Sequence, residues 1–259
     1  MTNKTSYVPK DRLTHIQSHL VGGFDEGCVR HIQNGTGNPY GCALLLGSHS
    51  LASAMNAWFG DKDLTSTRQW FREWARLQRM AYEIDLDPRG PGSWTSNLIA
   101  ALVSNDKELL DWFATNDFMF NKERAEDSRT GDFLTYQAYL ALRGDWTRLE
   151  ARCDEVIANP PKAKYLQDSL VDHQFYRALA RGDEAGMQTA IAVLLTPKML
   201  KAREDSESGF TQDLISTRAV IYTKLAWRHG FRFDPGSPLV PSEWLPLDPA
   251  PPWPSPYGI

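Results

Sequence analysis

The apolar residues between Arg12 and Gly230 recur mainly at three- and four-residue intervals, and the strict alternation typical of strands is rare. This spacing places apolar side chains on one face of a helix and predicts an all-α fold. One helix is expected to begin near Asp63 and to end before residues 87–92, which are rich in proline and glycine. We expect an aromatic core stripe on this helix and a solvated row of arginines opposite: Trp70, Phe71, Trp74, Leu77 and Tyr82 against Arg68, Arg72, Arg76 and Arg79.

A short motif repeats along the middle of the chain. An Ala-Leu pair is followed within a few residues by Asn-Asp or Gly-Asp, and the three aspartates are 39 and 38 residues apart. Asn or Gly can adopt the left-handed conformation that ends one helix, and the Asp side chain can accept the free N–H groups that begin the next. We therefore assign three aspartates as structural helix caps in tight turns: Asp106, Asp145 and Asp183.

The helices that follow these turns share a pattern. Apolar residues stand 4, 8, 11 and 12 positions beyond Asp145 and again beyond Asp183, which predicts one buried stripe per helix. Both helices stop before a proline, and a further helix is expected over residues 211–228. A period of this size is typical of stacked helix pairs. We predict antiparallel pairs stacked in an α-solenoid-like repeat array.

The chain changes character from Phe231 onward, where nine prolines exclude a regular helix over most of the segment. Several aromatic and aliphatic residues are interleaved with them, which argues against a free linker. We expect residues 239–247 to pack on the helices, with one helical turn near Trp244, and the last few residues to fray. The predicted organisation is an N-terminal helical portion (1–90), a repeat region (91–230) and a packed Pro-rich tail (231–259), in one continuous domain.

Composition narrows the classes of partner. With 28 Lys and Arg against 32 Asp and Glu, the net charge is −4, so no basic surface for nucleic acid is expected. Three widely spaced cysteines suggest neither a disulfide framework nor a zinc ribbon. The polar N-terminal residues lack the apolar run of a signal peptide, and no later run is long enough to span a membrane. We expect a cytoplasmic protein with no membrane association.

Three features of the sequence could indicate a metal, nucleotide or catalytic site, but a purely structural role is the favoured interpretation of each. His15 and His19 have the spacing of two zinc ligands, but no third ligand is evident, so we expect no metal site. Residues 34–41 contain Gly-x-Gly without the strand or the Lys-Ser/Thr of a phosphate loop, which indicates a turn between helices and no bound cofactor. Nine tryptophans and many carboxylates leave an α/α carbohydrate-active hydrolase as an alternative.

The end of the repeat region carries a resemblance. It reads LISTRAVIYTKLAWRHG from Leu214 to Gly230, followed by FRFDPGSPLVPSEWL to Leu245. This long helix, short extended link and Asp…Ser-Pro-Leu-Val-Pro ending resemble the immunity protein 49 family of bacterial polymorphic toxin systems, over roughly residues 93–248. The resemblance implies a non-enzymatic protein that binds and neutralises a cognate toxin.

An inhibitor inside the cytoplasm meets toxins that act there, and nucleases or nucleotide-consuming toxins are natural candidates. Preorganised stacked helices lose little entropy on association, and connecting loops can carry specificity. We expect acidic partner-binding residues in two charged connectors, facing a basic toxin surface: Glu123, Glu126, Asp127, Glu204, Asp205 and Glu207. Because repeat proteins often place such insertions on one side, the two connectors are expected to share a face. A helical-repeat adaptor for another protein or peptide is the alternative; the oligomeric state is left open.

Overall fold

The computed structural model describes residues 10–84 and 95–259. Within these residues the chain is helical and contains no strand, which confirms the all-α prediction. The predicted helix break at residues 87–92 and the domain boundary at 90–91 lie outside this part of the chain. The helices are α1 (Lys10–Leu20), α2 (Glu26–Asn34), α3 (Pro39–Phe59), α4 (Leu64–Ile84), η1 (Thr95–Asn97), α5 (Leu98–Ser104), α6 (Lys107–Thr115), α7 (Lys122–Glu126), α8 (Gly131–Arg143), α9 (Trp146–Ala158), α10 (Lys164–Gln167), α11 (Leu170–Arg181), α12 (Glu184–Leu194), α13 (Pro197–Ala202), η2 (Glu204–Ser206), α14 (Thr217–Arg228) and η3 (Ser242–Trp244).

The repeated motif forms three similar turns between consecutive helices. Asn105, Gly144 and Gly182 end α5, α8 and α11 in the left-handed conformation, with φ of 54°, 75° and 69°. In the two later turns, the next backbone N–H returns to the helix, where Asp145 N donates to Leu140 O and Asp183 N to Ala178 O. These bonds satisfy carbonyls that the helix end leaves free, and they send the chain back along the preceding helix.

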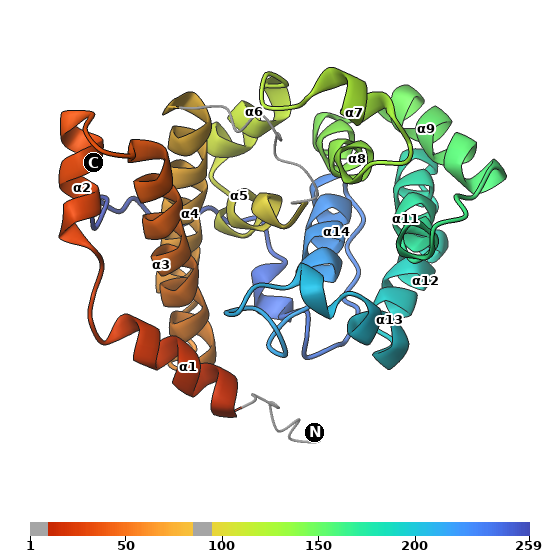
Figure 1. Cartoon of the computed structure of the whole chain (residues 1–259). Coiled ribbons are helices and arrows are strands. Elements are labelled where there is room, and N and C mark those ends of the chain that lie inside the picture. Colours follow the sequence, from red (N-terminus) through yellow and green to blue (C-terminus); the bar gives the residue numbers. More distant parts are fainter. Residues whose placement is uncertain (1–9, 85–94) are drawn as a thin grey trace, which may run out of the picture.

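Helices from different repeats pack against one another to form the stack. α11 packs between α9 and α12, while α14 packs on α5 and α12 (Figure 1). The residues predicted to form the repeated stripe are largely buried: Leu149, Cys153 and Val156 in α9, and Met187, Ile191 and Leu194 in α12. Burying each of these side chains contributes about 1.5–3 kcal/mol. The repeat interfaces are therefore a substantial part of what holds the fold together.

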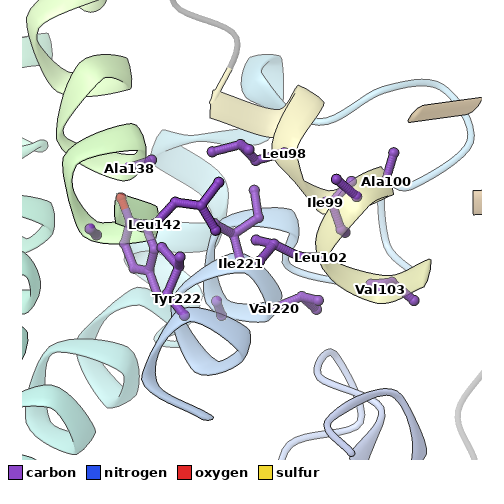
Figure 2. Close-up of a cluster of buried hydrophobic side chains, with 14 of the residues drawn as sticks. Leu98, Ile99, Ala100, Leu102, Val103, Ala138, Leu142, Val220, Ile221 and Tyr222 are labelled. Atoms are coloured by element: carbon purple, nitrogen blue, oxygen red, sulfur yellow. The ribbon is translucent and has the colours of Figure 1, made fainter. Parts of the chain in front are cut away.

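The centre of the molecule is an apolar cluster between α5, α8 and α14. Figure 2 shows Leu98 and Leu102 of α5 beside Ile221 of α14 and Leu142 of α8, and all four are buried. Every residue of α5 is buried, which explains why this short helix is apolar from Leu98 to Val103. α5 thus joins the repeat stack to the N-terminal helices.

The N-terminal portion is built on the long pair α3 and α4, which lie side by side (Figure 1). The aromatic stripe of α4 packs as predicted, with Phe71 and Leu77 fully buried. Gly47 of α3 lies against Trp74, where an added Cβ would stand 3.0 Å from the ring. A close approach of the two helices therefore requires glycine at this position.

The arginine row of α4 is not a solvated face, so that prediction is wrong. The Pro-rich tail runs along it: Arg68 donates to Pro246 O at 3.2 Å, Arg72 to Trp253 O at 3.4 Å and Arg76 to Ser255 Oγ at 3.1 Å. A proline-rich segment offers backbone carbonyls but few backbone N–H groups. Arginine side chains, which are hydrogen-bond donors only, are therefore suitable partners for it.

The tail is anchored on the helices by buried side chains as far as Tyr257, and the expectation that its last residues fray is wrong. The predicted turn near Trp244 is η3, and the Trp244 side chain is fully buried. Further on, Tyr257 is 4% exposed and its hydroxyl lies 2.9 Å from Ser50 Oγ in α3. This tyrosine joins a second, smaller apolar cluster with Cys28, Cys42, Leu46 and Leu77. The tail therefore closes over the N-terminal helices.

The last long helix is shorter than predicted. α14 begins at Thr217, whereas the apolar spacing predicted a start near residue 211. Asp213 has φ of 66°, a conformation that an α-helix excludes, so residues 211–214 form turns instead. The division into residues 1–90, 91–230 and 231–259 stays a prediction.

Candidate partner-binding cleft

A cleft of about 600 Å³ opens between the repeat stack and α14. It is bordered by the end of α12, by α13 and η2, by the start of α14 and by the extended link at Leu239. Its apolar lining is Leu194, Met199, Leu200, Ile215, Pro238 and Leu239. A concave surface of this size, with apolar walls and a few polar groups, is typical of binding sites.

Local sequence fixes the walls of the cleft. Thr196 caps α13 through a hydrogen bond from Met199 N, and Pro197 occupies the first turn, where no N–H is needed. Ser216 N donates to Leu239 O at 2.9 Å, which ties the link to the start of α14. Glu207 accepts a bond from Thr217 N at 2.8 Å and caps α14 from outside the helix. These bonds hold the cleft in one arrangement.

The floor of the cleft is a buried ionic cluster. Asp172 of α11 is fully buried, and Arg203 donates to both of its oxygens, at 2.9 and 2.5 Å. Arg218 of α14 donates to Oδ1 at 3.3 Å, and the Tyr222 hydroxyl donates to the same oxygen. Burial by itself would raise the pKa of Asp172, but the charges of Arg203 and Arg218 outweigh it and hold this pKa well below its usual range. The carboxylate therefore remains ionised.

The rim of the cleft carries charges that are mostly paired. Lys201 forms an ion pair with Glu204, whose other oxygen accepts from Gln212 Nε2 at 2.9 Å. Asp213 pairs with Arg12 of α1 at 3.3 Å, so the N-terminal helix is attached beside the cleft. Because both pairs are exposed to water, each adds little to stability.

The six predicted partner-binding residues do not form one surface. Glu204 and Glu207 line the cleft, and Asp205 is exposed between them. The other three, Glu123, Glu126 and Asp127, belong to α7 and its end, at the upper edge of the view in Figure 1, whereas α13 lies at the lower edge. The expectation that the two connectors share a face is wrong, because the long connections leave their helix pairs at different ends.

Most of the six carboxylates are engaged within the protein. Glu126 pairs with Arg148 and Arg152, and Glu207 accepts bonds from both Thr211 and Thr217. Hydrogen bonds from the Arg129 side chain and backbone lower the pKa of Asp127 to about 2. Glu123 and Asp205, in contrast, each lack a hydrogen bond or ion pair within the part of the chain that the structure describes. These two side chains are open to a partner.

The three aspartates of the repeat cap the helices that follow them. Asp106 accepts from Leu109 N at 3.0 Å, Asp145 from Arg148 N at 3.4 Å and Asp183 from Gly186 N at 2.9 Å. Asp106 also binds Arg72 Nε of α4 at 2.6 Å. The first cap therefore links the repeat region to the N-terminal helices.

The histidines and the glycine-rich segment that could indicate a metal or cofactor site lie in packing contacts and in a turn between helices. His15 and His19 pack on the ring of Phe210, with centroids 5.9 and 4.9 Å away. Residues 10–84 and 95–259 contain no group of three His, Cys, Asp or Glu side chains placed to bind a metal ion. Gly35 ends α2 and Pro39 begins α3, so the glycine-rich segment is a turn between helices, as predicted. The cleft has carboxylates in its lining but no tryptophan.

Sequence reasoning missed the residues of the cleft floor. Asp172, Arg203 and Arg218 meet across separations of 31 and 46 residues. One signal was present, because Arg218 and Asp172 stand within segments that are otherwise apolar at helical spacing. A charge on a core-facing stripe indicates a buried ion pair, although not its partner.

Comparisons with known proteins give one match. The family described as immunity protein 49 matches residues 61–244, which run from just before α4 to the end of η3. Comparison with curated proteins and with solved structures gives no significant match. No helix in the described residues combines the length and the apolar character needed to cross a bilayer. The match covers most of the chain, including the repeats and every residue that lines the cleft, and the chain belongs to the immunity protein 49 family.

Proposed function

We propose that this protein binds a cognate bacterial toxin in the cytoplasm and neutralises it through protein–protein contact, without catalysis. Family membership over residues 61–244 is the observation that carries the proposal. Immunity proteins of toxin systems act on a partner protein, and a nuclease or a nucleotide-consuming enzyme is the class of toxin that we expect. Inhibition follows either from covering the toxin's active site or from holding it in an inactive shape.

The cleft between α12, α13 and α14 is our candidate for the contact surface. Its apolar walls supply area whose burial favours association, and its hydrogen-bonded borders are already ordered in the free protein. A preorganised surface loses less entropy on binding than a mobile one. These two properties support a role in tight and specific association.

The acidic residues beside the cleft are proposed to meet basic groups of the toxin. Asp205 is exposed without a partner in the described residues, and Glu204 lines the cleft with an ion pair to the exposed Lys201 that a partner can replace. Glu207, in contrast, caps α14, and Glu126 is held by two arginines, one of them buried. Glu123, which has no partner in the described residues, lies on the separate α7 surface. We therefore assign Glu204 and Asp205 to the principal contact and Glu123 to a second, peripheral one.

Co-expression with the product of the neighbouring reading frame tests the function. We expect this chain to rescue growth and to copurify with that product in a stable complex. A variant with charges in the cleft wall, Leu200→Glu with Leu239→Glu, serves as the matched loss-of-binding form once its helical content is verified, because both side chains are partly exposed in the cleft. If the neighbouring product is harmless or forms no complex, the helical-repeat adaptor becomes the better reading.

Charge reversal tests the acidic contacts separately. Replacing Glu204 and Asp205 with Lys is expected to slow association at low salt, because opposite charges accelerate encounter. The same change at Glu150 and Asp154 of α9, which pair with Arg181 of α11, provides a control at a distance from the cleft. Equal association rates for both double variants would reject the assignment.

A further inference from the structure

We propose that the floor of the cleft binds a carboxylate of the partner protein through the guanidinium of Arg218. This inference rests on the proposed function and specifies the chemistry of the toxin surface: an Asp or Glu side chain flanked by apolar residues.

Arg218 uses only part of its hydrogen-bonding capacity. Its polar partners in the described residues are Asp172, through Nη1, and the hydroxyl of Tyr222. Tyr222 donates to the same Asp172 oxygen that Arg218 contacts, so both partners lie at one edge of the guanidinium. A guanidinium has five N–H groups in a fixed fork, and most of them therefore lack an acceptor here. The side chain is 18% exposed and lines the cleft, so its free donors face the space that a partner would occupy.

The floor also contains more positive than negative charge. Two guanidiniums share the single carboxylate of Asp172. Arg203 is the better satisfied of the two, because its Nη groups bind both Asp172 oxygens and the carbonyl of Asp168. Glu207 does not compensate Arg218 by an ion pair, since its oxygens accept from Thr211 and Thr217. One cation at the floor thus lacks a counter-charge of its own.

A carboxylate is the anion that fits this position. It matches the planar fork of arginine in two parallel hydrogen bonds, and Asp172 already holds the fork in place before a partner arrives. The carboxylates of Glu204, Asp205 and Asp213 at the rim would repel a polyphosphate chain, so a nucleic acid is disfavoured. The apolar walls suit the neighbouring side chains of a protein segment. A cation at the floor beneath acids at the rim also fixes the register in which a partner can dock.

The experiment measures binding of the neighbouring reading frame's product, with its toxic activity inactivated, by titration calorimetry. Arg218→Met is expected to weaken the affinity by about tenfold or more, since it removes a charge-assisted contact, and Arg218→Lys to recover only part of the loss. Arg30→Met, which removes one exposed arginine of α2, is the matched control and should bind as the wild type does. Equal affinity for Arg218→Met and wild type would overturn the inference while leaving the proposed function intact. Absence of binding by the wild type would instead reject the proposed function itself.

Two further measurements keep the test decisive if Arg218→Met folds poorly. In the wild-type protein, arginine modification with phenylglyoxal should be blocked at Arg218 by the toxin, while the exposed Arg30 of α2 reacts equally with and without it. Undiminished modification of Arg218 in the complex would overturn the inference. Replacing the toxin's surface Asp and Glu residues one at a time should reveal one whose effect is non-additive with Arg218→Lys. If every such pair is additive, no toxin carboxylate occupies the floor.

Discussion

The side-chain nitrogen of Lys224 in α14 lies 2.8 Å from Oδ1 of Asn105, the residue that ends α5. Asn105 has the left-handed backbone that Gly144 and Gly182 have in the other two turns. Its side chain also donates to Pro246 O and Asp248 O of the tail. The first copy of the repeat thus uses asparagine where the others use glycine, because this turn must also join α14 and the tail.

Asn105→Gly is predicted to destabilise the protein although glycine suits the backbone. The substitution keeps the turn but removes three hydrogen bonds, one from Lys224 and two to tail carbonyls, at a cost of about 1–3 kcal/mol. Urea denaturation measures this loss. Lys62→Gly is the control, because Lys62 is exposed with φ of 57° and has no comparable bonds. A change at Asn105 no larger than at Lys62 would contradict the interpretation.

The helix caps are predicted to differ in strength. Asp183→Ala should cost about 1 kcal/mol, the usual loss for an N-cap. Asp106→Ala should cost more, because it also removes the 2.6 Å contact with Arg72 of α4. Thermal unfolding of each Asp variant, measured alone and combined with Arg72→Gln, separates the contribution of the cap from that of the contact with Arg72. Additive effects of Asp106→Ala and Arg72→Gln would show that the contact contributes nothing.

The stability of the protein is predicted to fall as the pH drops from about 6.5 to 4. Burial lowers the pKa of His173 to about 4, because its ring packs between Gln137 and Phe133. The unfolded chain therefore binds more protons than the folded one in this range, and His173 contributes stability that is present above its unfolded pKa and is lost on acidification. At pH 4.5 the loss from this group is about 2–3 kcal/mol relative to pH 7.

Burial also lowers the pKa of His49 and His229, so these groups add to the same trend. Denaturant titrations at pH 7 and 4.5 measure the total change. His173→Gln should flatten the pH dependence while His31→Gln, at an exposed site, should not. Identical pH profiles for wild type and His173→Gln would rule out His173 as the source.

Loss of charge at two neighbouring acids, Glu207 and Asp205, is predicted to affect the stability of the protein differently. Glu207→Gln should reduce stability by about 1–2 kcal/mol, because it weakens the cap on Thr217 and the bonds from two threonine hydroxyls. Asp205→Asn should leave stability unchanged within about 0.5 kcal/mol, since its side chain is exposed without a partner in the described residues. Circular dichroism melts compare the two. Equal melting temperatures would argue against a structural role for Glu207.

Much of the local structure followed from sequence because its causes are local. A left-handed residue ends a helix and an Asp begins the next through bonds that span two to five positions, so Gly144 with Asp145 could be recognised without the fold. The apolar stripe of α9 was readable for the same reason, because helical spacing alone decides which side chains share a face. The family resemblance also began from contiguous residues at the end of the repeats.

Only the tertiary structure decided which charges meet and which surfaces remain open. Arg68 binds the tail 178 residues away, which turned an apparently solvated row into an interface. Asp172 and Arg218 are 46 residues apart, and neither residue's own helix specifies the other. Ion pairing depends on the distance between side chains in space, and that distance is set by how helices stack and by the length of their connections. The cleft, and the Arg218 guanidinium that shares Asp172 with Arg203 there, are properties of that packing.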